Sequence, residues 1–336
     1  MEDIIQRKKS LILTILLFFI VGAAFLWAEG TKETRLVDAV SRMAVLDETD
    51  TIVTFREYSG NIVEIPKNSE RTIVCLNSIL DVWYMAGGKS LARANGSINI
   101  PEEAADLPLL GRYISLNTEL MMELEPDLLI ISGNGHQLEI RDFFAADGVP
   151  GVAIKYSTYD DFRIVLDLFT RLTGNRELYN QELLLSQRKI QSIIDQVPVG
   201  EAPTVCILFS STKYVKVETQ NTVTGDYCAK LGAENIYKET TLEGATRVAL
   251  SLEYILEQDP DIIFVTTMGD VGKCRARVDK DITSSDIWGD LTAVKNNRFI
   301  YLDKSFSVYK PNRAYPEAFK TMAEYLYPDT DFVLAE

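Results

Sequence analysis

Histidine, cysteine and positive charge are all scarce in this chain of 336 residues. One histidine is too few for a site that binds a bare zinc or manganese ion, because such sites take several histidines and carboxylates. Four cysteines without a Cys-x-x-Cys pair do not fit an iron–sulfur enzyme, whose cluster takes several thiolates. With 34 Lys and Arg against 49 Asp and Glu, the net charge of −15 argues against nucleic acid as a partner. The GxSxG and HExxH motifs of hydrolases are also absent.

The cysteines themselves are expected to play no chemical role. Cys75 and Cys206 lie within short, β-rich apolar runs, and we interpret both as inert residues of buried strands. A disulfide between Cys228 and Cys274 is possible, because the sequence does not give the distance between them.

The N-terminus has the pattern of an export signal. Basic residues at positions 7–9 precede an apolar run over residues 11–27, and the small residue Ala28 follows. We expect residues 1–28 to be a signal peptide, although an apolar run of this length also fits a membrane anchor that stays in place. In both cases the rest of the chain is expected to work outside the cytoplasm, tethered if the segment is not cleaved.

Two stretches of the chain repeat each other without a gap. NTELMMELEPDLLII at 117–131 aligns with SLEYILEQDPDIIFV at 251–265, an offset of 251 − 117 = 134 positions. Each copy opens with a helix-capping residue, Asn117 or Ser251, and continues with an apolar helical stretch, a Pro-Asp turn and a β-rich run. The repeat predicts the same helix–turn–strand module in two similar lobes, with a ligand cleft between them.

The segments around the repeat define the expected domain order. Residues 177–197 have the apolar spacing of a helix that would span about 31 Å, and they separate the two copies. We therefore expect this helix to join the lobes. The predicted parts are a leader at 1–28, a linker with an N-terminal hairpin at 29–69, an N-terminal lobe at 70–159, a helical connector at 160–198 and a C-terminal lobe at 199–336.

Several of these segments together resemble a known family. TIVTFREYSGNIVEIP at 51–66, the two repeated modules and YKPNRAYPEAFKTMAEYLYPD at 309–329 are similar to the opening hairpin, paired modules and closing helix of the helical-backbone (class III) solute-binding proteins of ABC importers. These proteins take up ferric siderophores, haem and cobalamin. The resemblance implies an α/β fold of two Rossmann-like lobes joined by a single long α-helix, in a monomeric periplasmic binding protein that is not an enzyme.

The resemblance also implies a class of ligand. We expect an iron complex, a ferric siderophore or haem, and no intrinsic cofactor. Cobalamin or a molybdate-type oxyanion stays an alternative ligand, and a chelatase-like or nitrogenase-like enzyme on the same scaffold is the alternative of another class.

Glu119 and Glu253 match the two glutamates with which the family contacts arginines of the membrane permease. Each lies two residues after the capping residue of its module. The alternative is that acidic residues simply favour the first turn of a helix. The symmetry of the two positions favours docking, because helix preference alone does not require it.

Ligand-binding residues are expected in loops at the carboxyl ends of strands, on both sides of the cleft. Tyr113 and Arg247 each stand six residues before a docking glutamate, and together they suit a flat anionic ligand by stacking and charge pairing. His136 follows a strand and is read as a loop residue, either an iron or haem ligand or a solvated side chain. Arg313 either adds positive charge to the cleft or packs on the surface. The other candidates are Asn77, Arg112, Lys213, Tyr214, Tyr309 and Lys310.

Overall fold

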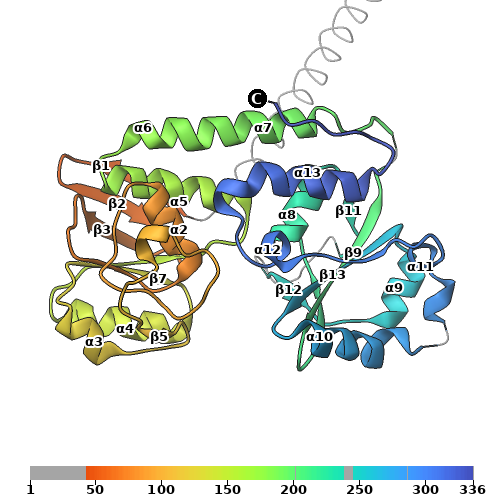
Figure 1. Ribbon diagram of the computed structural model, residues 1–336, viewed down its shortest axis with the longest axis horizontal. Coiled ribbons are helices and arrows are strands. Elements are labelled where there is room, and N and C mark those ends of the chain that lie inside the picture. The colour runs from red at the N-terminus through yellow and green to blue at the C-terminus, as the bar shows by residue number, and fades with distance from the viewer. Residues whose placement is uncertain (1–42, 201, 238–244, 286, 336) are drawn as a thin grey trace, which may run out of the picture. The chain divides into compact units, whose positions relative to one another are not determined.

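The described residues form four β-sheets, of which the parallel sheet β4-β7-β8 and the six-stranded sheet around β9 and β13 lie in different lobes (Figure 1). The computed structural model describes residues 43–200, 202–237, 245–285 and 287–335. The predicted leader at 1–28 and the first part of the linker lie outside these residues. No helix in the described part of the chain is both long and apolar enough to cross a membrane.

The described chain begins with a three-stranded antiparallel sheet. The predicted hairpin is confirmed as β2 and β3, with Gly60 in the turn at a φ of 90° that glycine adopts without strain. Alternating residues of β2 are buried, as expected of a strand with one covered face. Ahead of the hairpin, residues that the sequence indicated as linker form a third strand, which pairs with β2. The strands are β1 (Ala44–Glu48), β2 (Ile52–Arg56) and β3 (Ile62–Pro66).

The N-terminal lobe adds a parallel sheet with the strand order β4-β7-β8. All five residues of β7 are buried, which explains its unbroken apolar sequence. A short hairpin, β5–β6, follows a long loop that begins after α2. The elements are β4 (Thr72–Val74), α2 (Asn77–Met85), η1 (Glu102–Ala104), β5 (Gly111–Arg112), β6 (Ser115–Leu116), α3 (Thr118–Glu123), β7 (Leu128–Ser132), α4 (Gly135–Ala146) and β8 (Gly151–Ile154).

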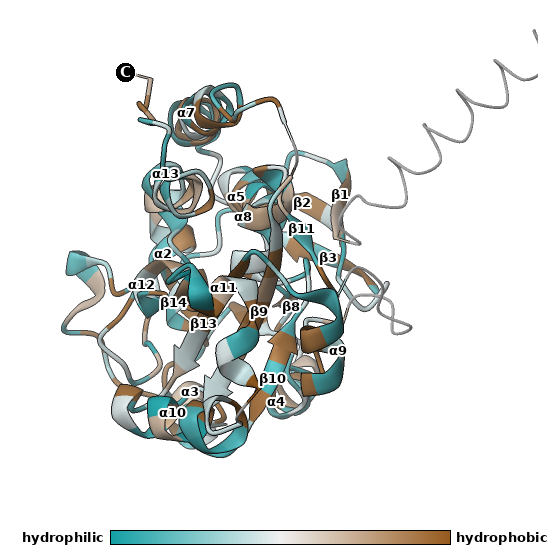
Figure 2. Ribbon diagram, turned by 90° about the vertical axis from the view of Figure 1, so that its right-hand side faces the viewer, coloured by the Kyte–Doolittle hydropathy of each residue, from teal (hydrophilic) through white to brown (hydrophobic). Residues whose placement is uncertain are grey.

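The C-terminal lobe is built on a larger, mixed sheet. Its strand order is β12-β10-β9-β13-β14, and β11 pairs with β9. Apolar residues run along β9, whereas polar residues gather on the outer turns of α10 (Figure 2). The elements are β9 (Thr204–Ser211), β10 (Val215–Glu218), α8 (Val223–Lys230), β11 (Glu234–Asn235), β12 (Arg247–Val248), α9 (Leu252–Gln258), β13 (Ile262–Met268), α10 (Val271–Val278), η3 (Asp279–Thr283), η4 (Trp288–Asp290), α11 (Thr292–Lys295), β14 (Phe299–Tyr301) and α12 (Lys304–Ser307).

Helices connect the sheet of the N-terminal lobe to the sheet of the C-terminal lobe. The expected helix over 177–197 appears as three consecutive elements from Arg176 to Ile194, with a π-helical stretch in the middle, and it runs along the top of both lobes in Figure 1. The last helix, α13, lies beside α7. The domain boundaries given above stay a prediction. The helices are α5 (Tyr159–Leu172), α6 (Arg176–Leu178), η2 (Tyr179–Leu184), α7 (Leu185–Ile194), and, after η5 (Asn312–Ala314), α13 (Tyr315–Leu326).

The repeated modules have matching backbone details. The side chains of Asn117 and Ser251 accept hydrogen bonds from the third residue of α3 and α9, respectively. Glu125 and Asp259, again 134 positions apart, both have a positive φ, at 43° and 40°. The two modules lie in different sheets, one in each lobe. The predicted α/β fold with two lobes is therefore confirmed.

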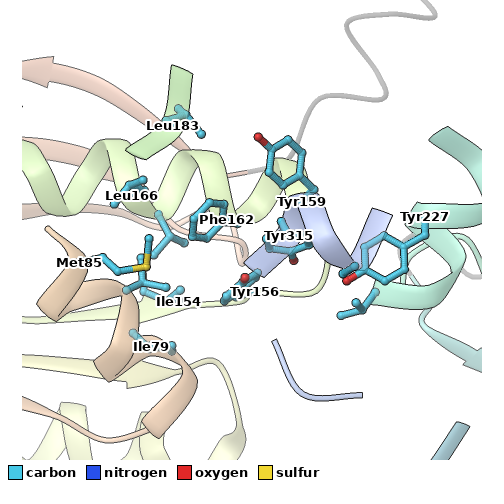
Figure 3. Close-up of a cluster of buried hydrophobic side chains, with 14 of the residues drawn as sticks. Ile79, Met85, Ile154, Tyr156, Tyr159, Phe162, Leu166, Leu183, Tyr227 and Tyr315 are labelled. Atoms are coloured by element: carbon cyan, nitrogen blue, oxygen red, sulfur yellow. The ribbon is translucent and has the colours of Figure 1, made fainter. Parts of the chain in front are cut away.

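Aromatic side chains fill the space where the lobes meet. Tyr315 of α13 lies between Phe162 of α5 and Tyr227 of α8 (Figure 3), with ring centroids 5.2 and 6.1 Å away. Phe319, one turn along, packs against Tyr227 at 4.9 Å and Tyr159 at 5.9 Å. The two lobes thus share one continuous cluster of buried side chains, and each lobe also has a smaller cluster of its own.

The structure also answers the question about the cysteines. Cys75, Cys206, Cys228 and Cys274 are all free and buried, so Cys228 and Cys274 do not form a disulfide. Burial raises the pKa of the Cys75 thiol to about 12, which keeps it protonated and inert.

Candidate ligand-binding cleft

A cavity of about 680 Å³ lies between the lobes. Its N-terminal wall comes from the start of α2, the loop after it and the β5–β6 turn, and its C-terminal wall from the ends of β10 and β13, from β12 and from the segment after α12. The lining residues are Leu76, Asn77, Ser78, Ala94, Asn95, Gly96, Ser97, Ile98, Asn99, Tyr113, Ser157, Glu218, Thr222, Val223, Thr246, Arg247, Met268, Gly269, Ser307, Val308, Tyr309 and Lys310.

Five of the residues expected at the site meet in this cavity. Asn77 and Tyr113 come from the N-terminal lobe, and Arg247, Tyr309 and Lys310 from the C-terminal part of the chain. Asn77 is the first residue of α2, three positions after the end of β4, so it lies near the carboxyl end of a parallel strand, where ligands commonly bind. Tyr113 and Arg247 line opposite walls of this cavity, and their ligand-binding role stays a prediction.

Four other candidates do not line this cavity. Arg112 is the exposed last residue of β5, and Lys213 and Tyr214 form the turn between β9 and β10. His136 was read as a loop residue, and this is wrong: it lies in the first turn of α4. Asn134 caps that helix by accepting a hydrogen bond from the Gln137 amide, so the helix begins where the sequence indicated a glycine-rich turn.

His136 has a partner within its own lobe. Its Nε2 accepts a hydrogen bond of 3.4 Å from the backbone N–H of Leu116, in the β5–β6 hairpin. A nitrogen that accepts this bond has its lone pair engaged, so it is not free to bind a metal ion in this conformation.

The positive charge of Arg247 is already paired. Its Nε and Nη2 both donate to Oε1 of Glu218, at 3.0 and 2.7 Å, and its guanidinium lies 3.6 Å from the ring centroid of Phe209. Glu218 is 1% exposed, and burial raises the pKa of its carboxyl group against the opposing effect of Arg247. Arg247 is therefore held in place by two hydrogen bonds to one carboxylate oxygen, and among the described residues its guanidinium has no other hydrogen-bond partner.

Lys310 supplies a second cation. Burial lowers the pKa of its ammonium group to about 8, although Asp161 and Glu218 act in the opposite direction. The Lys310 carbonyl accepts a hydrogen bond of 2.7 Å from the Asn99 side chain, which joins the two walls of the cavity. Lys310 is thus a cation whose charge changes close to physiological pH.

Arg313 does not reach the cavity. Its guanidinium makes a bidentate ion pair with Glu182, with bonds of 3.0 and 2.8 Å, on the π-helical stretch before α7. The sequence left two roles for Arg313, adding positive charge to the cleft or packing on the surface, and the structure shows the second. Its pKa is raised mainly by this hydrogen-bonded pair.

Two parts of the site were not found in the sequence. Glu218 is the last residue of β10, a strand of four residues. The sequence signal that could have indicated it is a charged residue at the end of an alternating pattern. The loop at 94–99 carries the polar sequence Ala-Asn-Gly-Ser-Ile-Asn, which indicates a turn but gives no hint that the turn faces a cavity.

Known proteins share this architecture. A crystal structure of an ABC transporter substrate-binding protein from Listeria monocytogenes superposes with a TM-score of 0.67 at 21% identity, covering 78% of this chain and 100% of that one. Staphylococcus aureus IsdE complexed with heme gives 0.64 at 20% identity, covering 76% and 98%. The vitamin B12 binding protein BtuF of Vibrio cholerae gives 0.62 at 19%, covering 78% and 98%.

Sequence comparison leads to the same group. The high-affinity heme uptake system protein IsdE of Staphylococcus aureus is 24% identical over 209 residues, which is 61% of this chain and 69% of IsdE. The model of the periplasmic binding protein family matches residues 73–306, which include both modules and most of the cavity wall. The chain therefore belongs to the periplasmic binding protein family.

Proposed function

We propose that this protein is the substrate-binding component of an ABC importer, and that it captures an iron complex, a ferric siderophore or haem, and delivers it to a membrane permease. The observation that carries the proposal is the cavity between the lobes. Its volume of about 680 Å³ is in the range of small-molecule sites, and both lobes line it.

The chemistry of the walls suits a large, partly apolar iron complex that carries a few acidic groups. Tyr113 is 48% exposed and offers a ring for stacking, and Arg247 and Lys310 offer donors to acidic groups. Tyr113, Tyr309 and Met268 also bring the phenol and thioether groups that proteins use as haem-iron ligands. The naming of the relative IsdE as a heme uptake protein supports haem as one candidate.

The docking role of Glu119 and Glu253 is part of the proposal. Both side chains are exposed in the first turn of their helices, α3 and α9, which belong to opposite lobes (Figure 1). Two carboxylates held by a shared core have a defined separation, and this suits a two-fold symmetric permease with arginines at its surface. The protein would act as a monomer in the periplasm, free or tethered.

A titration tests the ligand. Purified protein is mixed with haem, several ferric siderophores, cobalamin and molybdate, and binding is followed by tryptophan fluorescence and by the absorption band of the bound complex. We expect saturable binding of haem or of a ferric siderophore. Binding of cobalamin or molybdate alone would replace the iron complex as the ligand, and binding of none would reject the proposal.

Uptake of labelled ligand by cells tests the docking. Glu119→Ala and Glu253→Ala should each reduce uptake severalfold and leave the affinity nearly unchanged, because neither residue lines the cavity. Reversal to Lys should reduce uptake further, since like charges would then face the permease arginines. Glu139→Ala, which removes an exposed carboxylate from α4, is the matched control. Uptake by the double Ala variant at the wild-type rate would reject this role.

A further inference from the structure

The carboxylate of Glu218 is incompletely satisfied. Its Oε1 accepts both hydrogen bonds from Arg247, but its Oε2 is buried without a hydrogen-bond partner among the described residues. The nearby hydroxyl of Thr222 donates to the Thr219 carbonyl at 3.0 Å, and it also acts on the Glu218 carboxyl group to lower its pKa. A buried acceptor without a donor is costly, and such atoms in native proteins call for an explanation.

A second unsatisfied acceptor lies on the other wall. Asn77 is 9% exposed, its Nδ2 donates to the Asn95 carbonyl, and its Oδ1 has no partner within the described part of the chain. Gly96 leaves room for this arrangement, since a Cβ there would come within 2.8 Å of Asn77 Nδ2. Both orphaned acceptors thus belong to residues that line one cavity, one on each lobe.

The charges of the described lining residues nearly cancel. Three of them have ionisable acidic or basic side chains, namely Arg247, Lys310 and Glu218, and their formal charges sum to 2 − 1 = +1. Glu218 neutralises Arg247 by direct contact, so the net charge offered to a ligand is that of Lys310 alone. Such a site gives a polyanion little net attraction, and it places a buried carboxylate beside the ligand.

We propose that Glu218 determines the specificity of this cavity, by selecting iron complexes of low net charge that carry hydrogen-bond donors and by discriminating against polyanionic ones. The inference rests on the proposed function, since it names the subclass of iron complex. A donor on the ligand satisfies Glu218 Oε2, and a second donor satisfies Asn77 Oδ1. A ligand without donors leaves both acceptors unpaired, and a polyanion is repelled by the carboxylate.

Two ferric siderophores serve as probes. Ferrichrome is neutral and has peptide N–H groups, whereas ferric enterobactin carries three negative charges. The measured quantity is the ratio of their dissociation constants, determined by fluorescence quenching. Wild-type protein should prefer ferrichrome. Glu218→Gln keeps the shape of the side chain but removes its charge, and it should shift the ratio towards ferric enterobactin by about tenfold or more.

A double variant distinguishes an effect of net charge in the cavity from an effect of misfolding. Arg247→Gln combined with Glu218→Gln removes the whole pair and leaves Lys310 as the net charge, so the ratio should return to within about threefold of the wild-type value. Glu139→Gln, an equal loss of charge on the exposed face of α4, should not change the ratio. Thermal melting shows which variants are folded.

The outcomes are distinct. An unchanged ratio in folded Glu218→Gln overturns the inference and leaves the proposed function intact. A wild-type preference for ferric enterobactin overturns it too, without any variant. Binding of haem but of neither siderophore also overturns it, because haem at neutral pH has no donor of its own. If the wild type binds no iron complex, the proposed function fails and the inference fails with it.

Discussion

The two lobes share a module but differ in the side chain that lies at the cavity just before it. Asp127 accepts hydrogen bonds from the Glu70 and Arg71 amides before β4, and Asp261 accepts them from the amide and hydroxyl of Thr204 at the start of β9. Each Pro-Asp turn thus attaches its module to the first strand of its own sheet. What the two lobes have in common is therefore the backbone arrangement of the module.

The difference appears six residues before Glu119 and six residues before Glu253. Tyr113 is 48% exposed in a two-stranded hairpin, whereas the corresponding Arg247 is paired with Glu218 and lies over Phe209. The N-terminal lobe therefore contributes an adaptable aromatic surface, and the C-terminal lobe a fixed ionic group. Equivalent positions in a repeat predict equivalent positions in the two lobes. The contacts that each side chain makes depend on the residues around it in its own lobe.

The largest expected effect concerns the core that the lobes share. Phe319→Ala should lower the free energy of unfolding by about 3–5 kcal/mol, because the buried ring contacts both Tyr159 of α5 and Tyr227 of α8. Chemical denaturation followed by circular dichroism should show one transition at lower denaturant. The exposed Phe143, replaced by Ala, is the control and should cost far less. Two transitions, one of them unaffected, would mean that the lobes are stabilised independently.

Removal of the two corresponding side chains should have unequal consequences. Arg247→Ala should weaken ligand binding by about 1.5–3 kcal/mol through a lost charge-assisted hydrogen bond, and it should also destabilise the fold, because Glu218 is left unpaired. Tyr113→Ala should weaken binding by about 0.5–1.5 kcal/mol and leave the unfolding transition nearly unchanged. Isothermal titration and thermal melting measure the two effects.

Tyr113→Phe extends this test. If the phenolate coordinates iron, this variant should lose the charge-transfer colour of the complex, and if the ring only stacks, it should keep both colour and affinity. Wild-type affinity in Arg247→Ala, Tyr113→Ala and Tyr113→Phe alike would place the binding site elsewhere.

Lys310, in the C-terminal part of the chain, should make ligand binding depend on pH. With a pKa lowered from 10.5 to about 8, Lys310 is charged below pH 8 and neutral above it, so affinity for an anionic ligand should fall as the pH rises through 8. The charged groups that act on it are Asp161, Glu218 and Arg247. Lys310→Met should remove this decline, and a decline that persists in the variant would assign it to another group.

The same shift affects stability in the opposite direction. Between about pH 8 and 10.5 the folded protein binds fewer protons at Lys310 than the unfolded chain does, so its contribution to stability rises with pH across this window. Comparison of wild type with Lys310→Met by denaturation at both limits measures this contribution.

A further effect concerns the helix caps of the module that the lobes have in common. Asn117→Ala and Ser251→Ala should each cost about 0.5–2 kcal/mol, because each removes one capping hydrogen bond, of 3.1 and 3.2 Å. Asn117→Ser and Ser251→Asn keep an oxygen acceptor and should retain most of the stability. A clear inequality between the two Ala variants would show that the modules are not equivalent in energy.

The sequence was a good guide wherever neighbours along the chain decide the structure. Caps, turns and apolar periodicity are local, so the modules, the hairpin and α13 with Pro316 in its first turn were predictable. The error at His136 is also local: Asn134 serves equally in a turn and as a helix cap, and only the packing of α4 on its sheet selects the cap.

What the sequence by itself determined is therefore the framework: two α/β lobes, their order, and the positions from which Tyr113 and Arg247 reach a common cleft. The tertiary structure decided the electrostatics of that cleft. Glu218 and Arg247 are paired across two antiparallel strands, and Lys310 meets Asn99 across 211 positions of chain. Such contacts depend on how strands and lobes are placed in space, and charge and pKa depend on burial, so neither can be read from the order of residues alone.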